Sequence, residues 1–107
     1  MHSLPSSNKL NVSASAKRDL ILIGEYTLRE WGAVQKKRYL GQIKKCFKLI
    51  SENPSVGRQR DDIDMGLFSH LAQKHVVFYR VIKNDLFVVR VLHESMDVEQ
   101  HLSSTIT

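Results

Sequence analysis

The last third of the chain contains two strongly apolar segments, residues 75–82 and 86–93, separated by the polar residues Lys83, Asn84 and Asp85. β-Branched and aromatic residues on both sides of a short polar turn are typical of a β-hairpin. Because most positions of both segments are apolar, and side chains alternate between the faces of a strand, both faces of this hairpin must be apolar. This property limits the possible folds more than any other feature of the sequence.

The register of the hairpin decides which side chains share a face. With Asn84 and Asp85 at the centre of the turn, Ile82 pairs with Phe87. One face then collects, around Arg80 and His93, the apolar residues Val76, Phe78, Ile82, Phe87, Val89 and Val91. The other face collects, around Arg90, the apolar residues Val77, Tyr79, Val81, Val88 and Leu92.

Two apolar faces need cover on both sides of the sheet, because an antiparallel sheet that faces water on one side is normally polar there. The chain's own helices can supply one layer. We expect a protein partner on the other face, since large exposed apolar patches usually mark interaction sites. The alternative is that the chain's own loops and C-terminal tail bury this second face.

The segment before the hairpin predicts a short strand and two helices. Residues 9–13 alternate between apolar and polar side chains, as a half-buried strand does. Ser13 or Ser15 can cap a helix that ends at Gly32, and Pro54 ends a second helix that begins directly after this glycine. The buried side of the first helix is expected to contain Ala16, Leu20, Ile23, Thr27 and Trp31, and that of the second Tyr39, Ile43, Cys46, Phe47 and Ile50.

The complete order predicts an α+β domain, with an N-terminal strand, a helical hairpin, and a three-stranded antiparallel meander whose one face is packed against the helices. A turn-rich, charged loop over residues 54–62 leads to a short strand at residues 67–71, the first of the meander. The domain is expected to cover residues 9–102 and to close with one helical turn. We expect residues 1–8 and 103–107 to be flexible extensions.

The composition predicts one small, soluble domain. The chain has 107 residues, a formal net charge of +5 and a sequence pI near 9.6, which favours acidic proteins or nucleic acids as partners without choosing between them. We expect no direct, sequence-specific binding of nucleic acid. Many of its lysines lie on the second predicted helix, where a basic surface is usually only solvated. Cys46 is the only cysteine, which excludes an internal disulfide and fits a reducing cytoplasm. No apolar run is long enough to span a membrane and no signal peptide is visible, so we expect a cytoplasmic protein.

No pattern in the sequence predicts a catalytic centre, a cofactor or a metal site. His70 and His75 are five residues apart, and no carboxylate or thiol spacing completes a zinc-binding set around them. Asp61, Asp62 and Asp64 lie in the arginine-rich loop, where neighbouring carboxylates pair locally or cap turns. Glycine-rich phosphate loops and serine or cysteine triads are not visible. We therefore expect a protein that acts by binding rather than as an enzyme.

Short motifs spread along residues 9–102 point to a known family. They are Trp31-Gly32, Asn53-Pro54, Gly57-Arg58, Gly66-Leu67, the segments 75–81 and 90–93, Met96-Asp97 and His101-Leu102. In this order and spacing the motifs resemble the ParE family of toxins. The resemblance implies the toxin half of a type II toxin-antitoxin pair, with a fold shared by the RelE ribonucleases. ParE-like toxins act on DNA gyrase and block replication, and the C-terminal segment of a ParD-like antitoxin wraps and neutralises them. Such a segment would cover the second face of the sheet.

Two sets of site residues follow from the resemblance and the charge pattern. We expect contacts to the target from the charged loop and the end of the hairpin, at Arg58, Arg60, His93, Glu94, Met96 and Asp97. We expect contacts to the antitoxin at Phe68, Phe78, Arg80 and Val89. Many relatives carry an arginine in place of Phe68, so this position departs from the family pattern and would enlarge an apolar partner surface. A chain truncated after Leu92 is expected to fold but to lose its toxicity.

The main alternative function is that of the RelE branch, whose members are ribosome-dependent mRNA endonucleases. Such chemistry needs a base, an acid and cations that stabilise the charged transition state. Ribonucleases of this fold place an arginine just after the residue that corresponds to His75, but here Val76 follows it. A substitute site would have to be assembled from Arg58, Arg60, Arg80 and His93. A DNA-binding regulator is a third possibility, suggested by the basic charge, although no recognition helix is visible.

Overall fold

The computed structural model describes residues 9–98 and 100–102. It contains two long helices, α1 (Ala14–Trp31) and α2 (Ala33–Glu52), and a short 3₁₀ helix, η1 (Pro54–Val56). The strands are β1 (Leu10–Val12), β2 (Arg58–Gln59), β3 (Phe68–Ala72), β4 (His75–Ile82) and β5 (Asp85–His93). None of the described helices is long and apolar enough to cross a membrane.

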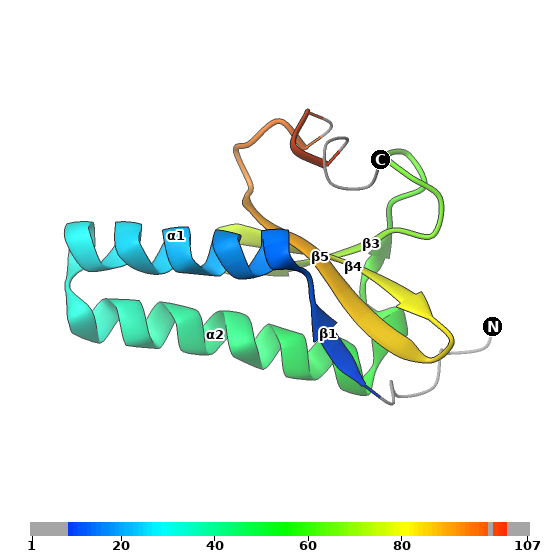
Figure 1. Cartoon of the computed structure of the whole chain (residues 1–107), viewed down its shortest axis with the longest axis horizontal. Helices are drawn as coiled ribbons and strands as arrows, with labels where there is room; N and C mark the ends of the chain where they lie inside the picture. Colours follow the sequence, from blue (N-terminus) through cyan, green and yellow to red (C-terminus); the bar gives the residue numbers. More distant parts are fainter. Residues whose placement is uncertain (1–8, 99, 103–107) are drawn as a thin grey trace.

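The strands form one mixed sheet in the order β1-β5-β4-β3-β2. β1 pairs with β5 in parallel, and the other neighbouring strands are antiparallel. The two helices form an antiparallel hairpin that packs against the sheet (Figure 1). The predicted α+β order of strand, helical hairpin and antiparallel meander is therefore confirmed. The sequence does not predict β2, in which two residues of the charged loop pair with the start of β3.

Helix α1 begins after Ser13, one of the two predicted caps. The Ser13 hydroxyl accepts a hydrogen bond from the backbone N–H of Ala16 at 3.0 Å and donates one to the carbonyl oxygen of Val89 on β5 at 2.7 Å. The cap therefore fixes both the start of the helix and its position on the sheet. The helix ends at Gly32, whose φ of 89° lies in the left-handed region and turns the chain into α2.

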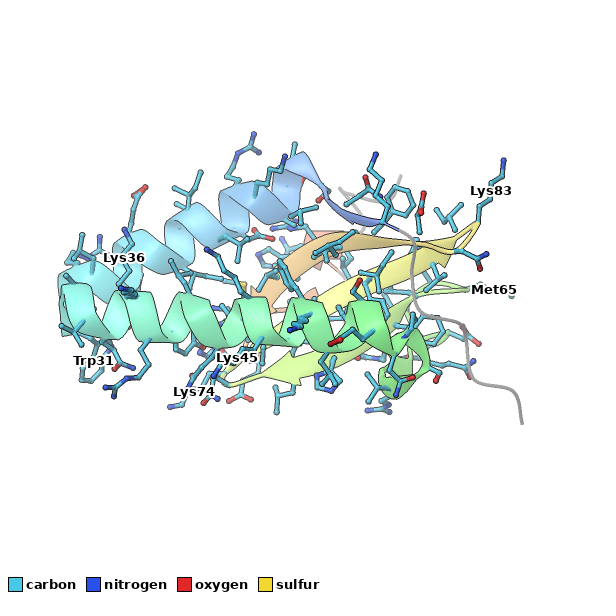
Figure 2. The ribbon with its side chains drawn as sticks, turned by 90° about the horizontal axis from the view of Figure 1, so that it is seen from below. Trp31, Lys36, Lys45, Met65, Lys74 and Lys83 are labelled. Carbon is cyan, nitrogen blue, oxygen red and sulfur yellow. The ribbon has the colours of Figure 1, made fainter. Side chains whose placement is uncertain are left out.

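The predicted buried sides of the two helices are correct except at one residue. Ile43 and Ile50 of α2 are fully buried, and Cys46 and Phe47 are nearly so. Trp31, by contrast, is 70% exposed, because the helical hairpin extends beyond the sheet at this tip (Figures 1 and 2). Helical periodicity indicates which side of a helix faces inward, but not where the sheet beneath it ends.

The helix-facing core lies between the hairpin and the central strands β4 and β5. Tyr79 of β4 is its largest fully buried side chain, and its ring stacks on that of Phe68 with the centroids 5.4 Å apart. The Tyr79 hydroxyl donates a hydrogen bond to the carbonyl oxygen of Pro54 at 2.6 Å and accepts one from the N–H of Gly57 at 3.0 Å. Burial raises the pKa of Tyr79 to about 12, so this hydroxyl stays protonated and ties the end of α2 to the sheet.

The predicted register of the hairpin is wrong. Lys83 and Asn84 have φ values of 52° and 67°, so these two residues form the centre of the turn, and Ile82 pairs with Asp85. Two consecutive left-handed residues define the type I′ turn that suits the twist of a hairpin. The Asn84-Asp85 pattern predicts the turn one residue too late, because lysine rarely adopts this conformation.

The register error shifts the pairing by two residues and so leaves the predicted faces unchanged, whereas a β-bulge changes them at the end of β5. Val88 pairs with Tyr79 whereas Arg90 pairs with Phe78, so Val89 is an extra residue in β5. Beyond the bulge, Val91 joins the helix-facing core and Leu92 turns to the second face. The predicted faces of Val91 and Leu92 are therefore exchanged.

The part of the second face around Phe78 is buried by the chain itself. Leu67 from the loop and Leu102 from the C-terminal helical turn are both fully buried against Phe78, together with Val89 and Leu92. Ile63, Val76 and Val98 complete this second-face cluster. The alternative of cover by loop and tail is therefore correct for this part of the face, where the structure leaves no room for the expected protein partner. Towards the turn of the hairpin, Ile82 of the same face remains 50% exposed.

Candidate functional site

A cleft of about 510 Å³ opens between α1, the end of β5 and the C-terminal segment. We call it the α1–β5 cleft. Its apolar walls include Leu22 and Tyr26 of α1 and Met96 of the C-terminal segment, which are 57%, 55% and 43% exposed. Its polar lining comes from Asp19, His75, Arg90, His93, Ser95 and His101. Exposed apolar walls around a few converging polar groups are typical of a binding site.

A buried ion pair connects the three parts of the chain that form the cleft. The Arg90 guanidinium donates two hydrogen bonds to the Asp19 carboxylate, at 2.8 and 2.9 Å, and a third to the carbonyl oxygen of His101 at 3.1 Å. Asp19 also accepts the backbone N–H of Val91 at 2.9 Å. The hydrogen bonds to Asp19 raise the pKa of Arg90 above its usual value. Since both side chains are largely buried, this bidentate pair holds α1, β5 and the tail in one arrangement.

Beside the cleft, a series of polar side chains in contact with one another extends across the start of β4 and the end of β5. The Tyr39 hydroxyl of α2 shares a hydrogen bond of 2.6 Å with Nδ1 of His75 and accepts the backbone N–H of Lys74 at 3.2 Å. The imidazole of His75 lies edge-on to that of His93, with the ring centroids 5.2 Å apart. His93 Nδ1 in turn accepts the backbone N–H of Ser95 at 3.1 Å. The helix layer and the start of the tail are thus linked through two imidazoles.

The surroundings of His75 determine the protonation of its imidazole. Burial and, to a smaller extent, the charge of the neighbouring His93 together lower the pKa of His75 to about 4, against the smaller opposite effects of Asp19 and Glu94. His75 is therefore neutral at neutral pH. Burial also raises the pKa of Tyr39. Tyr39 and His75 therefore form a neutral hydrogen-bonded pair at neutral pH. Among the described residues, no three His, Cys, Asp or Glu side chains come together to hold a metal ion.

The structure divides the predicted target-binding residues between two places. His93 and Met96 line the α1–β5 cleft, and Glu94 lies in the exposed turn beside them. Asp97 follows, and its carbonyl oxygen accepts the backbone N–H of His101 at 3.2 Å, so it begins the terminal helical turn. Arg58 lies on β2, which is separated from β5 by β3 and β4. Arg58 is exposed there and does not reach the cleft.

The neighbouring Arg60 forms an ion pair within the charged loop. Its guanidinium donates to both carboxylate oxygens of Asp62 at 3.1 Å and lies 5.8 Å from the centroid of the Phe78 ring. Asp64 pairs with Arg80, and Asp61 accepts the backbone N–H of Gly66 at 3.2 Å. The prediction that the loop aspartates pair locally or cap turns is therefore confirmed for Asp61 and Asp62, whereas Asp64 pairs with a residue of β4 that is 16 positions away in the sequence. These contacts hold the loop over the second face.

The four predicted antitoxin-binding residues do not form one surface. Phe78 is fully buried and Val89 is 9% exposed, both beneath the loop and the tail. Phe68 packs against the helix-facing core instead of enlarging a partner surface on the second face. Arg80 lines a separate cleft of about 660 Å³ beside β1 and β5, where it pairs with Asp64. Phe78 and Val89 are hidden because the loop and the tail cover them. Phe68 lies on the helix-facing side because side chains alternate between the two faces of β3.

Sequence reasoning misses Asp19, Leu22 and Tyr26, which form the helical side of the cleft. One signal was available: Asp19 lies next to the predicted buried stripe of α1, and Arg90 interrupts an apolar strand, so each charge required a partner. Leu22 and Tyr26 carry no such signal. Their position beside the tail depends on the tertiary structure.

Solved structures with the same arrangement define the class of this fold. A chain titled "Chromosomal ParDE TA system from P. aeruginosa" superposes with a TM-score of 0.71 and 16% identity, covering 79% of this chain and 94% of that one. A chain of "the toxin-antitoxin complex RelBE2" from Mycobacterium tuberculosis gives a TM-score of 0.65 and 20% identity, covering 86% and 97%. The helical hairpin on a mixed sheet is therefore the RelE/ParE toxin fold.

Sequence comparison identifies the family within this class. Residues 10–98 match the family model "ParE toxin of type II toxin-antitoxin system, parDE". "Toxin ParE1" of Mycobacterium tuberculosis is 35% identical over 97 residues, which are 90% of this chain and 99% of that protein. "Toxin ParE1" of Caulobacter vibrioides is 34% identical over 91 residues, 85% and 94% of the two chains. The chain belongs to the ParE family of type II toxins, as the motifs predict.

Proposed function

We propose that this toxin acts in the cytoplasm by binding DNA gyrase and blocking replication, without covalent chemistry of its own, and that a ParD-like antitoxin neutralises it. The antitoxin would occupy the α1–β5 cleft. The observation that supports this position is the exposure of Leu22, Tyr26 and Met96, three large apolar side chains around one cleft. Surfaces of this kind are costly to leave in water and are the usual anchors of a protein partner.

Charge supports an acidic antitoxin. The chain carries 16 lysines and arginines against 11 aspartates and glutamates. Long-range attraction would therefore guide an acidic segment to the toxin and raise the rate of association. The apolar walls of the cleft would then supply most of the binding energy.

The cations that a ribonuclease would need are engaged in pairs. Arg60 and Arg80 are neutralised by Asp62 and Asp64, and Arg58 lies on β2, away from His93 at the end of β5. A general base, a general acid and a free cation must converge on one phosphate for RNA cleavage. This distribution favours action by binding, while the choice of gyrase rests on the membership of the ParE family.

One experiment separates gyrase inhibition from the RelE alternative. The chain is induced without an antitoxin, and DNA-damage signalling is compared in time with translation arrest. Early DNA breakage that is absent when a toxin-resistant gyrase is supplied supports the proposal. Immediate cleavage of mRNA on ribosomes, with no early DNA damage, would instead establish the endonuclease.

The position of the antitoxin is tested with paired variants of α1. Tyr26→Ala combined with Leu22→Ala removes the helical wall of the cleft, and we expect a ParD-like antitoxin to lose at least tenfold in affinity for this variant. Ile21→Ala combined with Leu28→Ala is the matched control, since these side chains are also exposed but do not line the cleft. Equal affinities of both double variants would place the antitoxin elsewhere.

A further inference from the structure

The excess positive charge of the chain is concentrated on α2. This helix carries six cations, at Lys36, Lys37, Arg38, Lys44, Lys45 and Lys48, and one acid, Glu52. Six less one gives α2 a formal charge of +5, which equals the net charge of the whole chain. The remaining residues therefore carry as many acids as bases. The basic character of the protein is a property of one helix and not of its surface in general.

Five of these cations lie on the exposed side of the helix, which we call the basic face. Lys37, Lys44 and Lys48 follow at intervals of seven and four residues, so they form one row about 16 Å long. Arg38 and Lys45 form a second row beside it. Lys36 is separate, because its side chain lies over Gly24 of α1.

The turn between β3 and β4 extends the basic face. In Figure 2, which looks onto α2, the labelled Lys45 and Lys74 project from the same edge of the molecule. Lys74 is exposed. The surface is therefore broader than the helix that carries it.

No acid of the described residues neutralises the basic face. The ion pairs between described side chains involve Arg29, Arg60, Arg80 and Arg90, and none of them includes a cation of the basic face. Like charges placed side by side on one helix repel each other and reduce its stability. An anionic partner would relieve this repulsion.

We propose that the basic face binds the phosphodiester backbone of duplex DNA, without reading its sequence. A row of exposed cations matches the regular phosphates of a duplex, and release of the DNA's counter-ions supplies the affinity. Single-stranded nucleic acid would need aromatic side chains for stacking, but Tyr39 and Phe47 of α2 pack in the core. The choice of DNA over RNA rests on the proposed function, because gyrase holds duplex DNA.

A folded protein partner fits this face less well. Protein interfaces are anchored by clustered apolar or aromatic side chains. The exposed apolar residues of α2 are Val34 and Leu49, which lie at opposite ends of the helix, about 22 Å apart. The cations between them offer charge without an apolar centre. The basic face thus differs from the α1–β5 cleft, where apolar side chains gather.

The test measures the binding of a labelled, mixed-sequence DNA duplex to the full chain by fluorescence anisotropy between about 50 and 200 mM salt. The variant replaces Lys37, Lys44 and Lys48 with Gln, and the matched control replaces Lys9, Lys17 and Lys83, which are exposed lysines outside α2. Both variants lose the same charge. We expect the α2 variant to bind DNA roughly tenfold more weakly. The slope of log binding constant against log salt concentration should become shallower by about 2.7, at about 0.9 for each of the lost phosphate contacts. The control should retain most of the affinity and slope.

Three results would overturn the inference. Equal losses in both variants would mean that only the net charge attracts DNA. Tighter binding of an RNA duplex than of DNA would reject DNA as the ligand, and tighter binding of a polyglutamate peptide would assign the face to an acidic protein segment. Circular dichroism and thermal unfolding confirm that the variants are folded. The assay contains no gyrase, so a negative result would not contradict the proposal of gyrase binding, which has a separate test.

Discussion

The chain covers most of both faces of its sheet, but by different means. On one face, α1 and α2 supply two long helices whose apolar sides repeat at regular intervals. On the other, the irregular loop and the tail bury Phe78 and Leu92, and polar contacts from Arg80 and Arg90 to residues distant in the sequence hold these segments in place. Local sequence rules therefore govern the first layer, whereas long-range polar contacts govern the second. The consequence is that the second layer should be the more sensitive to loss of a single charge.

Asp19→Ala should have the largest effect. It leaves the Arg90 guanidinium buried without its carboxylate and also removes the acceptor of the Val91 N–H. Breaking a buried pair from one side typically costs about 3–5 kcal/mol. Urea denaturation should show this loss. Glu25→Ala, an exposed acid on the same helix, is the control, and a similar small change in both variants would contradict the structural role of the pair.

Leu102→Ala tests whether the tail is part of the core. Leu102 is fully buried in the second-face cluster, so its truncation should lower the free energy of unfolding by about 2–4 kcal/mol. The comparison is Phe47→Ala in the helix-facing core, for which about 3–5 kcal/mol is typical. A negligible loss at Leu102 would mean that the tail only rests on the sheet. For the same reason, truncation after Leu92 should impair folding, in contrast to the expectation from sequence.

The lowered pKa of His75 predicts that the stability of the protein depends on pH. Because the pKa of His75 is lowered to about 4 in the folded chain and lies near 6.5 when unfolded, the unfolded state binds a proton first as the pH falls. The contribution is fully present above about pH 6.5 and is lost as the pH falls towards 4. His75→Asn should remove roughly 1–2 kcal/mol of this dependence, allowing for the partial exposure of the ring. If the free energy of unfolding of the unmodified chain and that of the His75→Asn variant change by the same amount from pH 7 to 4, the assigned role of His75 is contradicted.

The helix layer was predictable because its signals are local. Ser13, Gly32 and Pro54 mark the helix ends as expected, and Cys46 lies in the core. The register of the hairpin was not predictable in this way, because Lys83 adopts a left-handed conformation that lysine rarely takes. The α1–β5 cleft was missed in part because it joins residues far apart in the chain.

The smallest expected effect comes from two glycine substitutions, one in each layer. Gly41 lies within α2 with open space around an added Cβ, so Gly41→Ala should stabilise the protein by about 0.5–1 kcal/mol through helix propensity. Gly66 lies in the loop that covers the second face, at a φ of 82°, so Gly66→Ala should destabilise it by about 1 kcal/mol through strain. Opposite shifts of the urea midpoint would confirm that local preference supports the helix layer, whereas the loop needs a conformation that most residues avoid. Shifts in the same direction would mean that the two layers do not differ in this respect.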